Sequence, residues 1–225
     1  MASNPDTKRI LVVDIGGSNI KLIATGVENR IKIPSDPDLT AKRLVKQVRE
    51  ATADWDYDVI SLGAPCACKN NRPVKEPHNL GTGWIDFDFE AAFGKPTKVI
   101  NDATMQAIGC YQGGTMLFLG FGTGLGTTLI KNGTAVPLEA GHLPYRKKQS
   151  FEDYVGKDGQ AHLGQEKWNK HALRIIKILR HAFNADDVVL GGGNAKVIEN
   201  ITENTRCVTN HAAFDGGFRM WEADW

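Results

Sequence analysis

The chain has 225 residues, of which 41% are hydrophobic and 24% charged. These fractions are typical of soluble globular proteins and exclude fibrous and disordered classes. The formal net charge of +1 gives no overall attraction to nucleic acid or to acidic membranes, so any phosphate binding must be local.

The chain can bury a substantial core, as one domain or as two small lobes. Its first apolar run is short and ends at Asp14, which excludes a signal peptide or a membrane span there. Its cysteines are scattered: Cys66, Cys68, Cys110 and Cys207. This pattern indicates free thiols in a cytoplasmic protein, and a zinc site at the first pair would need a second pair of ligands.

The predicted elements mix strands and helices along the whole chain. Apolar runs predict strands within 8–17, 19–26, 57–65, 97–100, 115–130 and 186–193. Spacing and turn residues predict helices within 39–55, 102–111, 165–183 and 194–201. The loop at 68–84 is long enough to be functional or mobile. The class is therefore α/β, and a division near residue 100 would give an N-terminal lobe of 1–100 and a C-terminal lobe of 101–225.

Three glycine-rich turns follow apolar strands, at Asp14–Asn19, Gly120–Gly126 and Gly191–Asn194. Glycines let backbone N–H groups converge on a phosphate, and the hydroxyls of Ser18 and Thr123 can add donors. The first two turns lead into strands, which argues against a P-loop or a dinucleotide fingerprint. A tight hairpin explains each turn alone, and the third turn is also an ordinary boundary between strand and helix. Three together favour a phosphate-bearing ligand.

Several acidic and imidazole groups admit two interpretations. Asn101 and Asp102 are good helix N-caps, but Asp102 at the carboxyl end of a strand could also accept a proton from an attacking hydroxyl. Glu139 and His142, three residues apart, could bind polyol hydroxyls, hold a metal or belong to a polar loop. Glu152 could simply be an early acidic residue of a helix.

Eight segments in chain order resemble the ROK family of sugar kinases across nearly the whole chain. They are "VVDIGGSNIK", "GAP", "NLGTGW", "INDA", "GFGTGLGTTL", "LEAGH", "FEDYVG" and "VVLGGG". The segments "GHLPY" and "EDYVG" are similar to the polyphosphate glucokinase branch. The resemblance implies a two-lobed actin, sugar kinase and Hsp70-type fold with mixed sheets and an interlobe cleft, whose C-terminal helix could pack back on the first lobe. It also implies phosphoryl transfer from ATP or polyphosphate to the 6-hydroxyl of a hexose, with glucose the first candidate.

The resemblance assigns roles residue by residue. Asp102 would be the base that activates the sugar hydroxyl, and Asp14 would lie near Mg²⁺, through water, as that ion prefers. The other sugar hydroxyls would bind Asn79, Asn101, Glu139, His142 and Glu152. The donor phosphates would bind Gly16, Gly17, Ser18, Asn19, Gly122, Thr123, Gly124 and Gly192.

One segment departs from the family pattern. Many members carry a cysteine-rich zinc loop between His142 and Glu152, but here the connection is "LPYRKKQSF". No structural zinc is therefore expected, and the aromatic pair Tyr145 and Phe151 would order the segment instead. The local cations are Arg146, Lys147 and Lys148, and those of the long helix are Lys167, Lys170, Arg174 and Lys177. They could form a track for polyphosphate or an ordinary solvated face.

Other functions remain open from the sequence. One alternative is a kinase for mannose or an N-acetylhexosamine, and another is a non-catalytic sugar sensor. Sensors of the family carry an N-terminal DNA-binding module, for which the residues before the first strand leave little room. The expected partners are therefore a sugar and a phosphoryl donor, without nucleic acid or membrane. A homodimer and the role of the aromatic segment 212–225 are left undecided.

Overall fold

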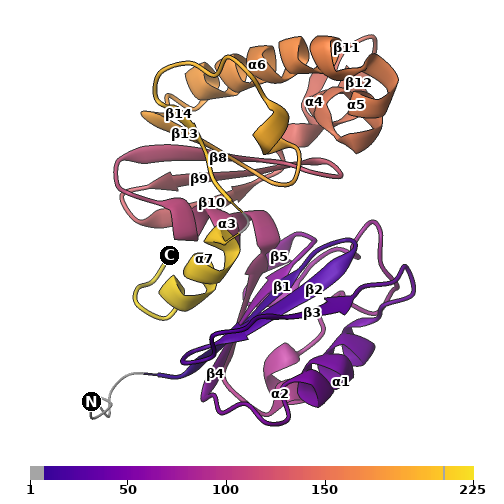
Figure 1. Ribbon diagram of the computed structural model, residues 1–225, viewed down its shortest axis with the longest axis vertical. Helices are drawn as coiled ribbons and strands as arrows, with labels where there is room; N and C mark the ends of the chain where they lie inside the picture. The colour runs from indigo at the N-terminus through magenta and orange to yellow at the C-terminus, as the bar shows by residue number, and fades with distance from the viewer. Residues whose placement is uncertain (1–7, 210) are drawn as a thin grey trace. The chain divides into compact units, whose positions relative to one another are not determined.

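The computed structural model describes residues 8–209 and 211–225 (Figure 1). The chain divides into two compact units. The first contains the residues up to Asp102 together with Met220–Glu222, and the second contains Ala103–Arg219 with Ala223–Trp225. In the part of the chain that is described, no helix is both long and apolar enough to cross a membrane.

The first unit is built on a five-stranded mixed sheet with the strand order β3-β2-β1-β4-β7. Its strands are β1 (Ile10–Ile15), β2 (Asn19–Ala24), β3 (Ile31–Pro34), β4 (Val59–Ala64) and β7 (Thr97–Asn101). The strands β1, β4 and β7 run parallel, whereas β1, β2 and β3 form an antiparallel meander. The mixed sheets expected from the resemblance are therefore present.

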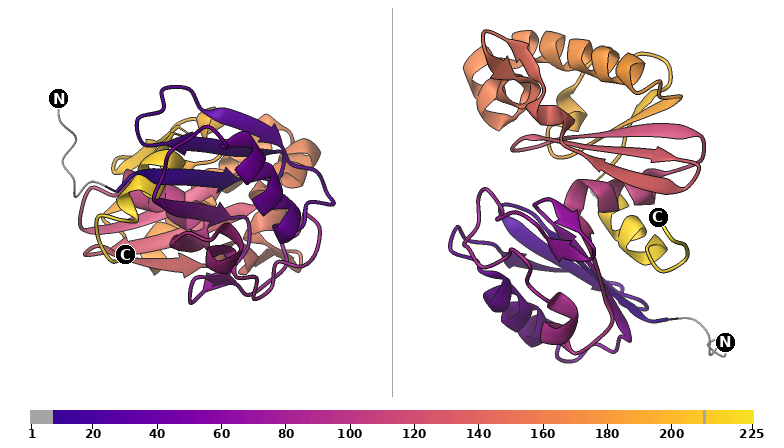
Figure 2. Two further views of the ribbon diagram at one scale, coloured as in Figure 1. Left: turned by 90° about the horizontal axis from the view of Figure 1, so that it is seen from below. Right: turned by 180° about the vertical axis from the view of Figure 1, so that it is seen from behind.

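Two helices cover one face of this sheet, α1 (Ala41–Ala51) and α2 (Phe89–Phe93) (Figure 2). All six residues of β1 and of β4 are buried, which explains their continuous apolar runs. Thr40 caps α1 by accepting a hydrogen bond from the backbone N–H of Arg43. The fully buried Trp84 donates from its indole N–H to the carbonyl of Leu39, at 3.1 Å. This bond fixes the end of the long loop beside α1.

Side-chain hydrogen bonds anchor the long loop. It contains a two-residue hairpin, β5 (Cys68–Lys69) with β6 (Arg72–Pro73). The side chain of Asn71 bonds the backbone of β7, with its amide donating to Thr97 at 2.6 Å. The carboxylate of Glu76 accepts the N–H groups of Gly83 and Trp84, at 3.1 and 3.0 Å. These bonds hold the loop along its length.

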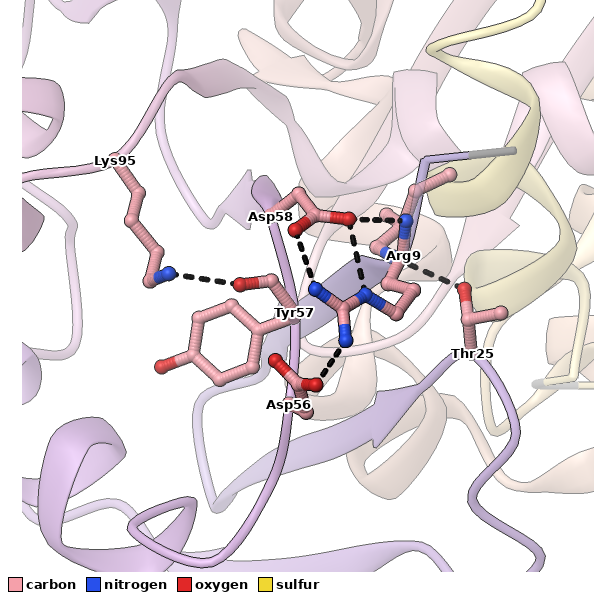
Figure 3. Close-up of polar contacts among 7 residues, drawn as sticks. Arg9, Thr25, Asp56, Tyr57, Asp58 and Lys95 are labelled. Carbon is pink, nitrogen blue, oxygen red and sulfur yellow. Dashed lines mark hydrogen bonds and ion pairs between the residues drawn. The ribbon is translucent and has the colours of Figure 1, made fainter. Parts of the chain in front are cut away.

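An exposed ion cluster joins the starts of β1 and β4 (Figure 3). The guanidinium of Arg9 contacts the carboxylates of Asp56 and Asp58, and the backbone N–H of Arg9 also donates to Asp58, at 3.0 Å. The hydrogen bond from the Arg9 side chain lowers the pKa of Asp58 to about 2. Because water screens exposed ion pairs, the cluster contributes little to stability and mainly links the starts of these two neighbouring strands.

The second unit repeats this topology with the strand order β10-β9-β8-β13-β14. Its strands are β8 (Thr115–Phe121), β9 (Leu125–Lys131), β10 (Thr134–Leu138), β13 (Asp187–Gly191) and β14 (Thr205–Cys207). Again an antiparallel meander of three strands is extended by parallel strands. In each unit the connection between the first two strands is one of the predicted glycine turns.

Helices complete the second unit. They are α3 (Asp102–Cys110), α4 (Phe151–Val155), α5 (Lys157–Leu163), α6 (Gln165–Ala182) and α7 (Ala212–Arg219). The first residue of α3, Asp102, still belongs to the first unit. The helix predicted within 165–183 is present as α6, and its apolar face is buried at Trp168, Ala172, Ile176 and Leu179. The indole N–H of Trp168 donates to the carbonyl of Val155 at 3.0 Å, which ties α6 to α4.

The prediction of a helix within 194–201 is wrong. Only one 3₁₀ turn forms there, η2 (Ala195–Val197), and a loop follows. Asn169 of α6 holds this loop, since its side chain exchanges hydrogen bonds with the backbone of Glu199 at 3.3 and 3.0 Å. These side-chain bonds occupy backbone groups that helical bonds would otherwise use.

The segment directly after α7, with Trp221, docks on the first unit. Met220–Glu222 belong to that unit, and the carbonyl of Met220 accepts a bond from the ammonium of Lys98, at 2.6 Å. The indole N–H of Trp221 donates to the hydroxyl of Ser61 at 2.9 Å. The segment is thus part of the fold.

Candidate active site

The predicted residues of the first unit, apart from Asn79, lie at the end of its sheet where the parallel strands finish. Parallel strands end at the same edge, and α/β proteins bind ligands there. Asp14 on β1 and Ile100 on β7 both pair in register with Gly63 of β4. Two strand spacings separate them, about 10 Å. The first glycine turn and the pair Asn101–Asp102 therefore share this edge.

The first glycine turn joins β1 to β2 and has one open side. The N–H of Gly16 donates to the carbonyl of Asn19 at 2.9 Å, which closes the turn. Ser35 supports it from behind, with its hydroxyl on the carbonyl of Gly16 at 2.9 Å. Gly17 and Ser18 are exposed, and a Cβ on Gly17 would meet no atom within 4 Å. A phosphate could approach the backbone from this side.

Asp14 has a cationic partner that the sequence reasoning missed. Asp14 is only 3% exposed, and its Oδ2 lies 2.7 Å from the ammonium of Lys21. The two residues are cross-strand partners in the β1–β2 hairpin. A buried carboxylate needs such a partner. The signal was the lysine seven residues after the aspartate, which the antiparallel register brings opposite it.

The residues at this edge fit a magnesium ion only in part. No group of three or more His, Cys, Asp or Glu able to hold a metal occurs within 8–209 and 211–225. One oxygen of Asp14 is already taken by Lys21. Magnesium keeps several waters and binds one or two carboxylates together with substrate phosphates. Asp14 fits this mode, with donor oxygens and water supplying the remaining ligands.

Asn101 and Asp102 lie where β7 passes into α3, and both are partly buried. The side-chain amide of Asn101 donates to the carbonyl of Cys66 at 3.3 Å. A hydrogen bond with Cys66, burial and then the charge of Asp102 raise the pKa of the Cys68 thiol. The Cys68 thiol beside Asp102 is therefore neutral at physiological pH. Asn79 is separate from this group, exposed in the loop that Glu76 and Trp84 anchor.

The second glycine turn, between β8 and β9, is held by a predicted sugar residue. The carboxylate of Glu152, in α4, accepts the N–H of Leu125 at 2.9 Å. A Cβ on Gly124 would collide with this carboxylate, so a side chain there would displace Glu152 from the turn. Thr123 is exposed, and a Cβ on Gly122 would meet no atom within 4 Å. This turn also has one packed side and one open side.

The third glycine turn packs against the second. Gly191 pairs in register with Gly120, and the N–H of Asn194 donates to the carbonyl of Phe121 at 3.0 Å. Gly192 has φ +82°, and a Cβ there would collide with the same carbonyl. The second and third turns thus form one glycine-lined edge of the sheet.

Three predicted sugar residues gather around Gly141 in the second unit. Glu139 and His142 flank it in the short turn η1 (Ala140–His142), with Oε2 of Glu139 at 3.3 Å from Nε2 of His142. Both side chains are more than half exposed, at 56% and 61%. A Cβ on Gly141 would lie 3.5 Å from Oε2 of Glu152. The cluster presents carboxylates and an imidazole beside the second glycine turn, the groups that bind sugar hydroxyls.

Sequence reasoning missed two further contacts of the second unit. The backbone N–H of Lys157 donates to the carbonyl of Thr123 at 3.1 Å, so an exposed lysine begins α5 beside the turn. Tyr145 contacts Phe151 with ring centroids 5.3 Å apart, as expected, but also Tyr154 and His171. Only the pair Tyr145–Phe151 was predicted, because long-range ring contacts leave no spacing signal.

Comparison with known proteins gives sequence relatives of one kind. The polyphosphate glucokinase of Mycobacterium tuberculosis is 26% identical over 202 residues, covering 80% of this chain and 76% of the relative. That of Mycobacterium leprae is 24% identical and is covered over 62% of its length. No family model matches the chain.

Solved structures settle the fold. The inorganic polyphosphate/ATP-glucomannokinase of Arthrobacter sp. strain KM superimposes with a TM-score of 0.81 at 21% identity, covering 95% of this chain and 98% of that one. A ROK family glucokinase from Streptomyces griseus gives 0.70 at 17% identity, over 94% and 98% of the two chains. This chain has the fold of the ROK sugar kinases. The predicted resemblance and the α/β class are confirmed.

Proposed function

We propose that the chain is a hexose kinase that transfers a phosphoryl group from ATP or polyphosphate to the 6-hydroxyl of glucose. The observation that carries the proposal is the position of Glu152. Its carboxylate accepts the backbone N–H of Leu125 in the second glycine turn and also lies against Gly141. Gly141 in turn stands between Glu139 and His142 in the sequence. One residue thus links a phosphate-type turn to a sugar-type cluster, as a kinase requires.

In this proposal the glycine turns bind the donor. Backbone N–H groups at Gly17 and Ser18, and at Gly122 and Thr123, would donate to phosphate oxygens. Donors fixed by a tight turn need no reorganisation as charge develops on the transferring group. Magnesium, where bound near Asp14, would neutralise donor charge.

Asp102 would act as the base. As the sugar oxygen forms its bond to phosphorus and the bond to the leaving phosphate breaks, the hydroxyl proton would pass to the carboxylate of Asp102. The neighbouring thiol of Cys68 is neutral and brings no competing charge. Asn101, Asn79, Glu139 and His142 would bind the other sugar hydroxyls.

His142→Ala is expected to raise the KM for sugar about tenfold, since one hydrogen bond from a positioned group contributes roughly 1.4 kcal/mol. The kcat should change little, because the lost contact exists in both ground and transition states. Initial rates over a range of glucose concentrations measure both constants. His162→Ala, at an exposed position of α5, is the matched control. An unchanged KM in His142→Ala would remove this residue from the sugar site.

A panel of acceptors tests the function itself. Glucose, mannose and N-acetylmannosamine are each incubated with the purified chain, Mg²⁺ and either donor, and phosphorylated sugar is identified by phosphorus NMR. Glucose 6-phosphate as the preferred product supports the proposal. Sugar binding without phosphorylation of any acceptor would favour a sensor, and preference for another sugar would change the substrate.

A further inference from the structure

The hairpin of β11 (Pro144–Arg146) and β12 (Gln149–Ser150) has an unusual turn. Arg146 pairs with Gln149, so Lys147 and Lys148 form a two-residue connection. Both are left-handed, with φ of 50° and 63°. Two-residue turns of this kind are normally Asn-Gly, because a left-handed backbone costs free energy for a residue with a longer side chain. Two lysines in this strained position point to a role for their charges.

This hairpin is fixed firmly to the rest of the second unit. The hydroxyl of Tyr145 lies 2.9 Å from Nδ1 of His171 in α6. The Tyr145 ring also packs edge-on against Tyr154 of α4, with centroids 5.0 Å apart. Figure 1 shows β11, β12 and α4 gathered at one end of α6. The lysine turn is therefore held in place relative to both helices.

The docking brings cations of the hairpin and of α6 together. The guanidinium of Arg146 lies over the Tyr145 ring, 5.6 Å from its centroid. Arg174 follows His171 by three residues on α6, so the two side chains are neighbours, and Lys177 follows Arg174 by another three residues. Burial lowers the pKa of His171, and the charges of Arg146 and Arg174 lower it further, as expected if both lie near the imidazole.

These cations are not neutralised within the unit. In the described ranges 8–209 and 211–225, none of Arg146, Lys147, Lys148, Arg174 and Lys177 forms an ion pair. Lys170 of the same helix does, at 2.7 Å from Glu166. Like charges held together without partners repel one another, and a bound polyanion would relieve that repulsion. We name these five residues the cation track.

The track begins close to the proposed donor site. The helix α4, whose Tyr154 packs on the hairpin, also carries Glu152, which holds the second glycine turn. Arg174 and Lys177 of the track also line the groove between α6 and the loop at 200–205, together with the apolar side chains of Ile178 and Ile201. Its cations thus extend from the hairpin to Arg174 and Lys177, which are just under one helical turn apart on α6.

We propose that the cation track binds the distal phosphates of an inorganic polyphosphate donor while the glycine turns hold the end that reacts. The inference rests on the proposed function. Polyphosphate carries charge along its whole length, so a row of unpaired cations complements it. The three phosphates of ATP would be used at the turns and gain little from the track.

The double variant Lys147→Asn/Lys148→Gly tests the track without disturbing the hairpin. It removes two charges, while Asn-Gly suits the left-handed turn. We expect the KM for long-chain polyphosphate to rise about tenfold and its salt dependence to weaken, since fewer phosphate contacts release fewer counterions. The KM for ATP and the kcat should stay within about twofold. Lys42→Gln/Lys46→Gln, on the exposed face of α1, is the control with equal charge loss.

The possible outcomes distinguish failure of the cation track from failure of the proposed kinase function. An unchanged polyphosphate KM, an equal rise in the ATP KM, or activity with ATP alone would overturn the track and leave the kinase intact. Hexose 6-phosphate from neither donor would overturn the function. Direct binding of fluorescently labelled polyphosphate, compared between the natural chain and the double variant, tests the track in either case. Equal affinity of the two proteins would contradict it.

Discussion

Asp102→Asn is expected to lower kcat by about 10²- to 10⁴-fold, the usual contribution of a general base. The substitution removes only the ability to accept a proton. Because Asn supports a helix start as well as Asp does, the purely structural role of Asp102 at the first turn of α3 would survive. Single-turnover rates with glucose and a saturating donor measure the loss.

Two controls sharpen this result. Glucose affinity and thermal stability of the variant should remain close to those of the natural chain, which excludes misfolding as the cause. Asp158→Asn, at an exposed acidic position in the first turn of α5, should leave kcat unchanged. A near-normal kcat in Asp102→Asn would show that another group takes the proton.

Gly192→Ala should destabilise the second unit by about 2–4 kcal/mol. Its φ of +82° is costly for any residue with a Cβ, and the new methyl group would collide with the backbone carbonyl of Phe121. That carbonyl also accepts the N–H of Asn194, so relief of the collision would disturb both glycine turns. The free energy of unfolding in denaturant measures the effect.

Gly193→Ala is the matched control for this variant. A Cβ there would meet no atom within 4 Å, and its backbone is outside the left-handed region. It should change stability by less than about 1 kcal/mol. If Gly192→Ala proved as stable as Gly193→Ala, the close packing of the third turn on the second would be contradicted.

The parts of the fold with a strong local signal were predictable from the sequence. The strands β1 and β4 are buried along their whole length and therefore read as unbroken apolar runs. The helix α6 shows its stripe because one face packs on the unit's core. Where tertiary contacts decide, prediction failed, as at η2, since the bonds from Asn169 to Glu199 leave no periodic pattern.

The contacts of the candidate site also fall into those that the sequence predicted and those that depend on tertiary structure. Glu139 and His142 are close in sequence, and their proximity followed from spacing. The pairing of Asp14 with Lys21 depends on the register of a hairpin. The contact of Glu152 with Leu125 depends on how α4 packs across the turn. Such contacts depend on how separate segments pack in space, and a single sequence does not show which residues of those segments meet.

The most direct test is formation of glucose 6-phosphate by the purified chain with glucose and Mg²⁺, supplied with either ATP or long-chain polyphosphate. The proposed function predicts this product from at least one of the two donors, and the cation track predicts it from polyphosphate. Hexose 6-phosphate from neither donor, with a folded protein that still binds sugar, would contradict the assignment as a kinase.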